Sequence, residues 1–365
     1  MDNKNARRLI ILTDGHTEPV TGKTAACVVR YRPEEVVALL DTTQVGKTSQ
    51  ELLGVGGKIP VVGSVADAPT ANTLLIGIAP AGGRIPASWR AIIMQAIERG
   101  MNVVSGLHEF ISSDPEFARV AAARGVTIYD VRKNNERDVS NRKGIREDCL
   151  RIHTVGHDCS VGKMIVSIEV ARALQRKGHD AKFVATGQTG IMVEGDGCPV
   201  DCVVSDFVNG AAEKLVLANQ HHDILVIEGQ GSLSHPRYSA VTLGLLHGSM
   251  PHGLIMCYEA GRTHVRGMDE IPLKSLKELI QVYEMMGSLQ TPCKIIGLGV
   301  NSRKLSDQDA QAECARVRSE FGLPACDVIR DGADELVEAV LDYQKELFAK
   351  VGSRQRTAGR QGNEA

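Results

Sequence analysis

Most of the 365-residue chain alternates short apolar runs with longer segments in which apolar residues recur every three or four positions. Short apolar runs bounded by Gly, Pro, Asn or Asp predict buried strands, and the longer spacing predicts amphipathic helices. Strands that alternate with helices are typical of parallel sheets covered by helices on both faces. The pattern therefore predicts an α/β fold.

The predicted strands fall into two groups that are separated by a charged stretch. The first group comprises residues 8–15, 35–41, 60–65, 72–79, 102–108 and 126–132, with helical spacing over 88–99 and 115–124. The second comprises 150–155, 181–187, 223–229, 253–258 and 294–300, with a last helix over 334–349. Residues 132–148 are polar and rich in charge, which is typical of a linker. We therefore predict two α/β domains, at 1–140 and 141–350, and a disordered polar tail at 351–365.

Composition narrows the possible partners. The formal net charge of -2 supplies no basic field for nucleic acid or anionic lipid, so we expect no nucleic-acid partner and no membrane partner. No apolar run approaches the length of a membrane span. The nine cysteines are scattered, and the nearest pair, Cys198 and Cys202, lacks the C-x-x-C spacing. These features predict a cytoplasmic protein with reduced thiols.

The segment HTVGHDCSVGKM, residues 153–164, joins a predicted strand to an amphipathic helix. A P-loop reads G-x-x-x-x-G-K-[ST], and its last hydroxyl binds magnesium; here five residues separate the glycines and Met164 replaces the hydroxyl. Backbone N–H groups at the start of a helix bind phosphate oxygens, and the charge of Lys163 would add to this binding. The predicted phosphate-binding residues are Gly156, His157, Asp158, Cys159, Ser160, Val161, Gly162, Lys163 and Met164.

Two other Gly-Lys-Thr segments, residues 14–26 and 44–50, do not have P-loop spacing. We interpret them as loop and helix-start residues, although their hydroxyls leave a nucleotide site in the first domain open.

Carboxylates follow two of the later predicted strands. Glu228 ends the strand at 223–229 and precedes a Gly-rich turn with His235, and Asp196 lies in the Gly-rich loop at 185–207. In P-loop folds the carboxylate at the end of such a strand faces the phosphate site. These residues are therefore candidates for catalysis.

Several segments resemble known families. Residues 156–163 resemble the stretched P-loop of dethiobiotin synthetase, and GIAPAGGRIP, VVSGLHEFISSDPEF, HDCSVGKM and VIEGQGSLSHP together resemble the D-glutamate N-acetyltransferase family. The resemblance covers residues 8–349. It implies an N-terminal Rossmann-like parallel sheet, a C-terminal P-loop NTPase-like parallel sheet, and acetyl transfer from acetyl-CoA to D-glutamate in D-amino-acid catabolism. The phosphates of coenzyme A are bound but not cleaved, so the loop needs no hydroxyl to bind magnesium. This is consistent with Met164 at that position.

This reaction needs a base and an acceptor site. The candidate bases, in order, are Glu228, His235 and Asp196, because amine acetylation requires a deprotonated amine. The candidate anchors for the acceptor carboxylates are Arg84, Arg132 and Arg262, which lie at predicted loop positions. We expect direct transfer, with Cys159 as the cysteine whose loop position suits a covalent route.

The residues leave two other functions open. One is an ATP-dependent ligase or kinase that acts on a small carboxylic acid; the other is a non-catalytic nucleotide-sensing module. For the acetyltransferase we expect acetyl-CoA as co-substrate, no tightly bound cofactor, no metal, only small-molecule partners, and a homo-oligomer.

Overall fold

The computed structural model describes residues 6–78 and 83–361. The chain divides into two compact units: an N-terminal unit of residues 1–134 with 188–202, and a C-terminal unit of residues 135–187 with 203–365. The first boundary falls within the predicted charged stretch. The sequence placed 188–202 in the second domain, whereas in the structure this segment belongs to the N-terminal unit.

The N-terminal unit contains a parallel sheet with the strand order β3-β2-β1-β4-β5-β6. Its strands are β1 (Leu9–Leu12), β2 (Val36–Leu40), β3 (Val61–Val62), β4 (Thr73–Ile76), β5 (Asn102–Ser105) and β6 (Ile128–Asp130). Each lies inside a predicted strand. The order 3-2-1-4-5-6 is that of the Rossmann fold, so the expected Rossmann-like domain is confirmed.

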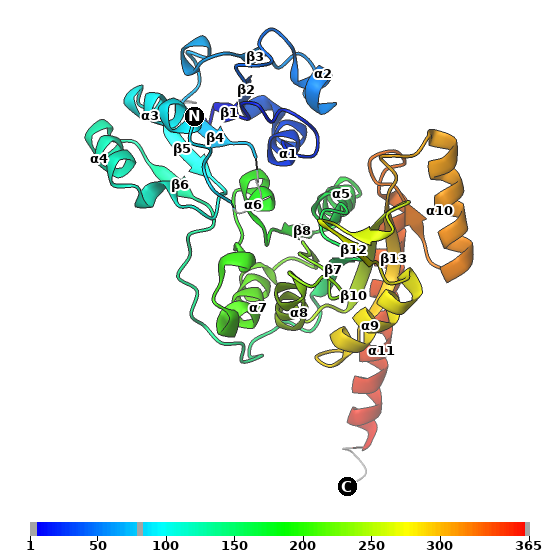
Figure 1. Cartoon of the computed structure of the whole chain (residues 1–365). Coiled ribbons are helices and arrows are strands. Elements are labelled where there is room, and N and C mark those ends of the chain that lie inside the picture. Colours follow the sequence, from blue (N-terminus) through cyan, green and yellow to red (C-terminus); the bar gives the residue numbers. More distant parts are fainter. Residues whose placement is uncertain (1–5, 79–82, 362–365) are drawn as a thin grey trace. The chain divides into compact units, whose positions relative to one another are not determined.

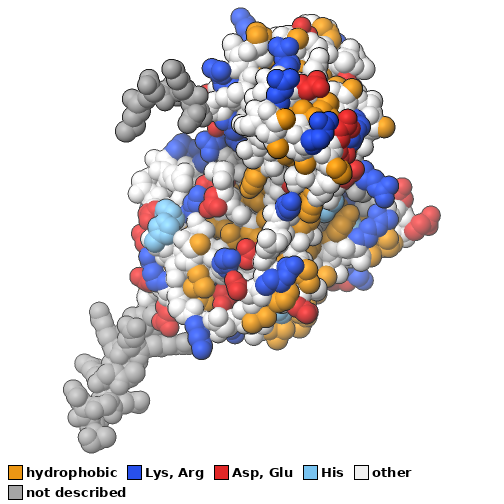
Figure 2. Space-filling model, turned by 90° about the vertical axis from the view of Figure 1, so that its left-hand side faces the viewer, with side chains coloured by type: hydrophobic (Ala, Val, Ile, Leu, Met, Phe, Trp, Pro, Cys, Tyr) orange, Lys and Arg blue, Asp and Glu red, His pale blue; other side chains and the backbone are white. Residues whose placement is uncertain are grey.

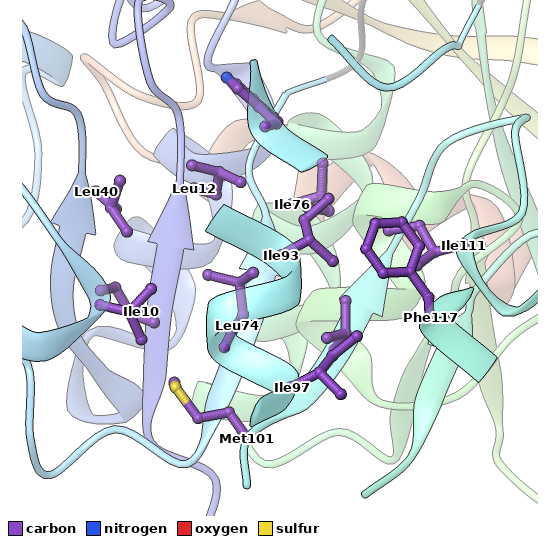
Figure 3. Packing of buried hydrophobic residues seen from close by; sticks show 14 of the residues in the cluster. Ile10, Leu12, Leu40, Leu74, Ile76, Ile93, Ile97, Met101, Ile111 and Phe117 are labelled. Atoms are coloured by element: carbon purple, nitrogen blue, oxygen red, sulfur yellow. The ribbon is translucent and has the colours of Figure 1, made fainter. Parts of the chain in front are cut away.

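Helices cover both faces of this sheet (Figure 1). The helices of this unit are α1 (Lys23–Tyr31), α2 (Ser49–Leu53), α3 (Trp89–Glu98), α4 (Pro115–Arg124) and, packed on α1 rather than on the sheet, α6 (Gln188–Glu194). The apolar side chains of α3 meet those of β1 and β4, and Phe117 of α4 packs against them (Figure 3). α6 packs on α1, and Arg7 and Arg32 donate hydrogen bonds to the backbone carbonyls of Met192 and Val193. These contacts explain why segment 188–202 belongs to the N-terminal unit.

The C-terminal unit contains a second parallel sheet with the order β14-β13-β10-β7-β9-β8. Its strands are β7 (Leu150–Gly156), β8 (Ala181–Val184), β9 (Ile224–Ile227), β10 (Gly253–Glu259), β13 (Lys294–Asn301) and β14 (Ala325–Cys326). β7 lies between β9 and β10, where the strand order reverses, and ligands of open α/β sheets bind beyond the carboxyl ends of strands at such a point. The P-loop-type domain expected from sequence is confirmed.

The helices of the C-terminal unit are α5 (Lys163–Arg176), α7 (Val208–Asn219), α8 (Ser239–Ser249), α9 (Leu276–Ser288), α10 (Asp307–Phe321) and α11 (Asp334–Gln361) (Figure 1). A small hairpin, β11 (His264–Val265) with β12 (Met268–Pro272), was not predicted. α11 continues to Gln361, where the sequence predicts a disordered tail from residue 351; residues 362–365 lie outside the described part.

Part of the charged stretch is ordered on the C-terminal unit. The buried carboxylate of Glu213 in α7 accepts hydrogen bonds from the backbone N–H groups of Asn141 and Arg142 and from the Ser140 hydroxyl. A buried carboxylate requires such donors, so residues 140–142 provide the hydrogen bonds that the Glu213 carboxylate of α7 needs.

Acidic and basic side chains are interspersed over the visible face of the molecule (Figure 2). Within residues 6–78 and 83–361, none of the helices is both long and apolar enough to cross a membrane.

Candidate functional site

The P-loop segment forms the turn between β7 and α5. Two of its residues have left-handed backbone conformations, Ser160 with φ 54° and Gly162 with φ 104°. The N–H of Val166 donates to the Gly162 carbonyl, so the N–H groups of residues 163–165 precede the first intrahelical hydrogen bond. They lie at the positive end of the helix dipole, which is suited to an anion.

Lys163 is buried within this turn. Its Nζ donates to the carbonyl oxygen of Asp158 at 2.8 Å, and burial lowers the pKa of Lys163. The aliphatic stem lies over Gly229: a Cβ at that position would be 3.2 Å from Lys163 Cδ and 1.6 Å from the carbonyl oxygen of Thr154. Glycine at 229 therefore allows β7 and the lysine to pack against the turn after β9.

Asp158 holds the loop in shape rather than facing solvent. Its carboxylate accepts hydrogen bonds from the N–H groups of Cys159 at 2.7 Å and Arg266 at 2.8 Å, and from Arg262 Nη1 at 2.9 Å. Burial alone would raise the pKa of Asp158, but these hydrogen bonds and the Arg262 charge leave it lowered. Asp158 is thus an anion that fixes the loop to the segment after β10.

Arg262 connects this loop to a second buried carboxylate. Its Nη2 donates to Glu259 Oε2 at 2.7 Å, and its Nη1 also donates to the Cys159 carbonyl at 2.9 Å. Glu259 ends β10 and also pairs with Arg303 at 2.7 Å and Lys304 at 2.8 Å. Three cations surround one carboxylate, which leaves an excess of positive charge at the edge of the sheet where the P-loop lies.

Glu259, Arg303 and Lys304 were not among the residues predicted from sequence. Glu259 directly follows the predicted strand 253–258, as Glu228 follows its own strand, so strand-end position was a usable signal. Arg303 and Lys304 lie on the turn after β13, and no sequence motif around them indicates a binding site.

Glu228 lies at the end of β9, next to β7 in the sheet. It is buried, and its Oε2 accepts hydrogen bonds from the N–H groups of Thr186 at 2.9 Å and Gly187 at 3.0 Å. Two backbone donors hold this carboxylate in one orientation, which is a requirement for a positioned base.

The Gly-rich turn after Glu228 packs on the P-loop. Tyr283 accepts a hydrogen bond from Leu233 N at 3.0 Å and donates to the Gly156 carbonyl at 2.9 Å, and Ser234 Oγ donates to the His157 carbonyl at 3.4 Å. The structure therefore brings the two segments predicted from sequence together at one edge of the sheet.

The histidines at this edge are buried. His235 Nδ1 accepts a hydrogen bond from Arg237 N at 3.1 Å, and its Nε2 lies 3.7 Å from Asp158 Oδ1. The buried Nε2 has no hydrogen-bond partner within the described residues, so His235 stays a candidate base. Burial lowers the pKa of His157 to about 4, and its Nε2 accepts from the Glu259 N–H at 3.2 Å.

Three of the remaining predicted residues belong to the N-terminal unit. Asp196 and Arg84 are exposed there. Arg132 belongs to the same unit and pairs with Asp201 at 3.0 Å. Arg262 belongs to the C-terminal unit, where it lies at the P-loop and binds the carboxylates of Asp158 and Glu259.

The surroundings of Cys159, which lies four positions before α5, decide whether its thiol ionises easily. Burial, and after it the Asp158 carboxylate, raise the pKa of the Cys159 thiol. A thiolate is therefore disfavoured there, contrary to the stabilisation expected from a helix start.

The other predicted loop residues differ in exposure. Val161 is buried, whereas Ser160 and Met164 are partly exposed.

Comparison with known proteins identifies relatives of both units. A family model described as the DUF1611_N Rossmann-like domain matches residues 42–134, and one described as the DUF1611_C P-loop domain matches residues 135–337. A crystal structure of a DUF1611 family protein from Anabaena variabilis has a TM-score of 0.87 and 38% identity, and the match covers 92% of this chain and 99% of that chain.

Two curated proteins named D-glutamate N-acetyltransferase are each 38% identical to the chain. The protein from Tritonibacter scottomollicae matches over 337 residues, which is 91% of this chain and 97% of its own length. The protein from a Pseudoalteromonas species matches over 268 residues, which is 73% of this chain and 80% of its own length.

Proposed function

We propose that this chain, which belongs to the DUF1611 family, transfers the acetyl group of acetyl-CoA to the amino group of D-glutamate. Its curated relatives are N-acetyltransferases, so the chain is an enzyme of the acyltransferase class. The product would be N-acetyl-D-glutamate, which we place in D-amino-acid catabolism.

The observation that carries the choice of donor is a P-loop that lacks the magnesium-binding hydroxyl. Lys163 and the N–H groups that begin α5 can bind phosphate oxygens, while Met164 supplies no metal ligand. Coenzyme A offers a pyrophosphate and a 3′-phosphate that are bound but not cleaved. The cations around Glu259 add to the positive potential at the same edge, which favours a ligand with several phosphate charges.

The acceptor must lose a proton before it attacks the thioester. We assign this step to Glu228, because its carboxylate is fixed by two backbone N–H groups at the end of β9. For an acceptor carboxylate we propose Arg84, whose exposed side chain makes no hydrogen bond or ion pair within the described residues. Replacing Arg84 with Lys should raise the KM for D-glutamate, because the bidentate geometry is lost.

Ligand-induced thermal shifts test the donor. A ligand that binds only the folded state raises the melting temperature, so acetyl-CoA and Mg-ATP should be compared at equal concentrations. We expect a shift with acetyl-CoA and release of coenzyme A thiol when D-glutamate is added. A shift with Mg-ATP alone, or no thiol release with D-glutamate, would contradict the proposal and favour a ligase, a kinase or a nucleotide sensor.

A further inference from the structure

A histidine beside the P-loop has a buried ring nitrogen without a partner. The His235 side chain is 1% exposed, and its Nε2 has no hydrogen-bond partner within the described residues. Nε2 lies 3.7 Å from Asp158 Oδ1, which is beyond hydrogen-bond range. Burial of a polar group without a partner is unfavourable, and a ligand atom that pairs with Nε2 would remove this cost. The ring nitrogen therefore indicates a ligand site.

The backbone determines which ring nitrogen of His235 carries the proton. The N–H of Arg237 donates to Nδ1 at 3.1 Å, so Nδ1 supplies its lone pair. Burial lowers the pKa of His235, although the Asp158 charge opposes this, so the ring is neutral at neutral pH. The single proton of the neutral ring then lies on Nε2. Nε2 is thus a donor, which favours an anionic ligand as its partner over the role of base.

Two arginines of the C-terminal unit flank this donor. Arg237 lies two positions after His235 in the turn that follows β9. Arg266 lies between β11 and β12, and its backbone N–H donates to Asp158 Oδ2 at 2.8 Å. Both side chains are exposed, and neither guanidinium makes a hydrogen bond or an ion pair within the described part of the chain. Arg237 Nη1 lies 3.8 Å from the place of a Cβ built on Gly267, so it reaches the residue next to Arg266.

These donors favour a carboxylate over a phosphate. A guanidinium binds a carboxylate through two parallel hydrogen bonds. The Asp158 carboxylate lies close to Nε2, and it repels a doubly charged phosphate more than a singly charged carboxylate. Arg262 and two backbone N–H groups offset the Asp158 charge, so an anion is still accepted. The phosphates of coenzyme A are assigned to Lys163 and the start of α5, which leaves the carboxylates of the acceptor.

We infer that His235, Arg237 and Arg266 bind the side-chain carboxylate of the D-glutamate acceptor and thereby select an acidic amino acid. The inference rests on the acetyl transfer proposed above and deepens it by naming a recognition site for the acceptor. It concerns one of the two acceptor carboxylates and uses residues of the C-terminal unit alone.

The position of Glu228 decides between the two carboxylates. Glu228, the base assigned above, is buried at the start of the turn that carries His235 and Arg237. The α-carboxylate lies next to the amine that Glu228 deprotonates. The side-chain carboxylate extends further from that amine, and it is the one that can reach the exposed guanidinium groups of Arg237 and Arg266.

Uncharged variants of the two arginines test the inference. Arg237→Gln and Arg266→Gln should each raise the KM for D-glutamate by roughly 10-fold or more, the scale of a lost charge-assisted hydrogen bond. The double variant should raise it further, and the KM for acetyl-CoA and the kcat should stay within about twofold of wild type. Arg176→Gln is the matched control: it removes an exposed arginine in the last turn of α5, at the end of the helix away from the P-loop.

Substrate analogues identify the group that is bound. D-glutamine has the shape of D-glutamate without the side-chain charge, so the wild type should prefer D-glutamate by the ratio of the two kcat/KM values. The double variant should lower this ratio by roughly 10-fold or more. Glutarate, which has no amine, should inhibit the wild type in competition with D-glutamate and should inhibit the double variant less.

Two variants of His235 separate a donor from a base. Glutamine places an N–H group close to the position of Nε2, whereas leucine does not. We expect His235→Gln to keep a KM for D-glutamate close to that of wild type and His235→Leu to raise it, with kcat little changed in both. A wild-type thermal shift with acetyl-CoA will show that each variant is folded.

Three outcomes overturn the inference alone. They are an unchanged KM for D-glutamate in the arginine double variant, a rise in the KM for acetyl-CoA that is absent with acetyl-dephospho-CoA, and a loss of kcat in His235→Gln. The second would assign the arginines to the 3′-phosphate of coenzyme A, and the third would make His235 a base. Failure of the wild type to release coenzyme A thiol with D-glutamate would instead contradict the proposed function, and the inference with it.

Discussion

Replacing Lys163 with Met tests whether the P-loop binds the phosphates of coenzyme A. Methionine keeps an aliphatic stem to pack over Gly229 and removes the charge, so it separates phosphate binding from packing. A charge-assisted hydrogen bond contributes about 1.5–3 kcal/mol, which corresponds to a rise in the KM for acetyl-CoA of roughly 10- to 150-fold. We expect the KM for D-glutamate to stay near its wild-type value.

The free energy of unfolding of the ligand-free protein should change little, by less than about 1 kcal/mol. The variant loses the hydrogen bond from Nζ to the Asp158 carbonyl, but it no longer buries an ammonium group whose pKa burial lowers. Lys23→Met is the matched control, because Lys23 also follows a glycine at a helix start yet is exposed. Steady-state kinetics and thermal shifts with coenzyme A measure both variants. An unchanged KM for acetyl-CoA in Lys163→Met would refute the assignment.

Three further variants or conditions have defined outcomes. Met164→Thr should retain activity without magnesium, which assays with and without EDTA will check. Arg262→Ala should lower the free energy of unfolding by about 3 kcal/mol in urea titrations, since it leaves two buried carboxylates with fewer partners. Burial lowers the pKa of His153 and His252 to about 3 and of His157 to about 4. These folded-state values lie below 6.5, so unfolding takes up protons as the pH falls; stability should drop by about 1.4 kcal/mol per pH unit for each histidine between pH 6 and 4.5, and urea titrations that show no such drop would contradict this.

The sequence predicted the strands that form the two buried sheets because their apolar runs are continuous. β1, for example, is buried at all four of its residues, and β10 at all seven. The short strand β14 and the hairpin β11–β12 have too few residues to produce such a run. No sequence feature indicated that segment 188–202 packs with the N-terminal unit, because the partners of α6 lie in α1, more than 150 residues earlier in the chain.

The P-loop site was predictable to the extent that it is local. Residues 156–164 form one turn, and Glu228 could be placed beside them because parallel strands end at the same edge. Arg303 and Lys304 reach Glu259 from more than 40 positions later in the chain, and no spacing rule connects them. Cys159 was a candidate because it precedes a helix start, but burial and the adjacent Asp158 raise the pKa of its thiol.

Glu228→Gln tests whether the carboxylate at the end of β9 is the base that deprotonates the acceptor. If Glu228 deprotonates the acceptor ammonium, Glu228→Gln should lower the turnover of D-glutamate by roughly 10²-fold and leave the thermal shift with acetyl-CoA close to that of wild type. Glutamine is nearly isosteric, and its amide oxygen can still accept from the N–H groups of Thr186 and Gly187, so the fold should persist. If Glu228→Gln kept wild-type turnover, or lost turnover only together with the thermal shift, its assignment as the base would be wrong.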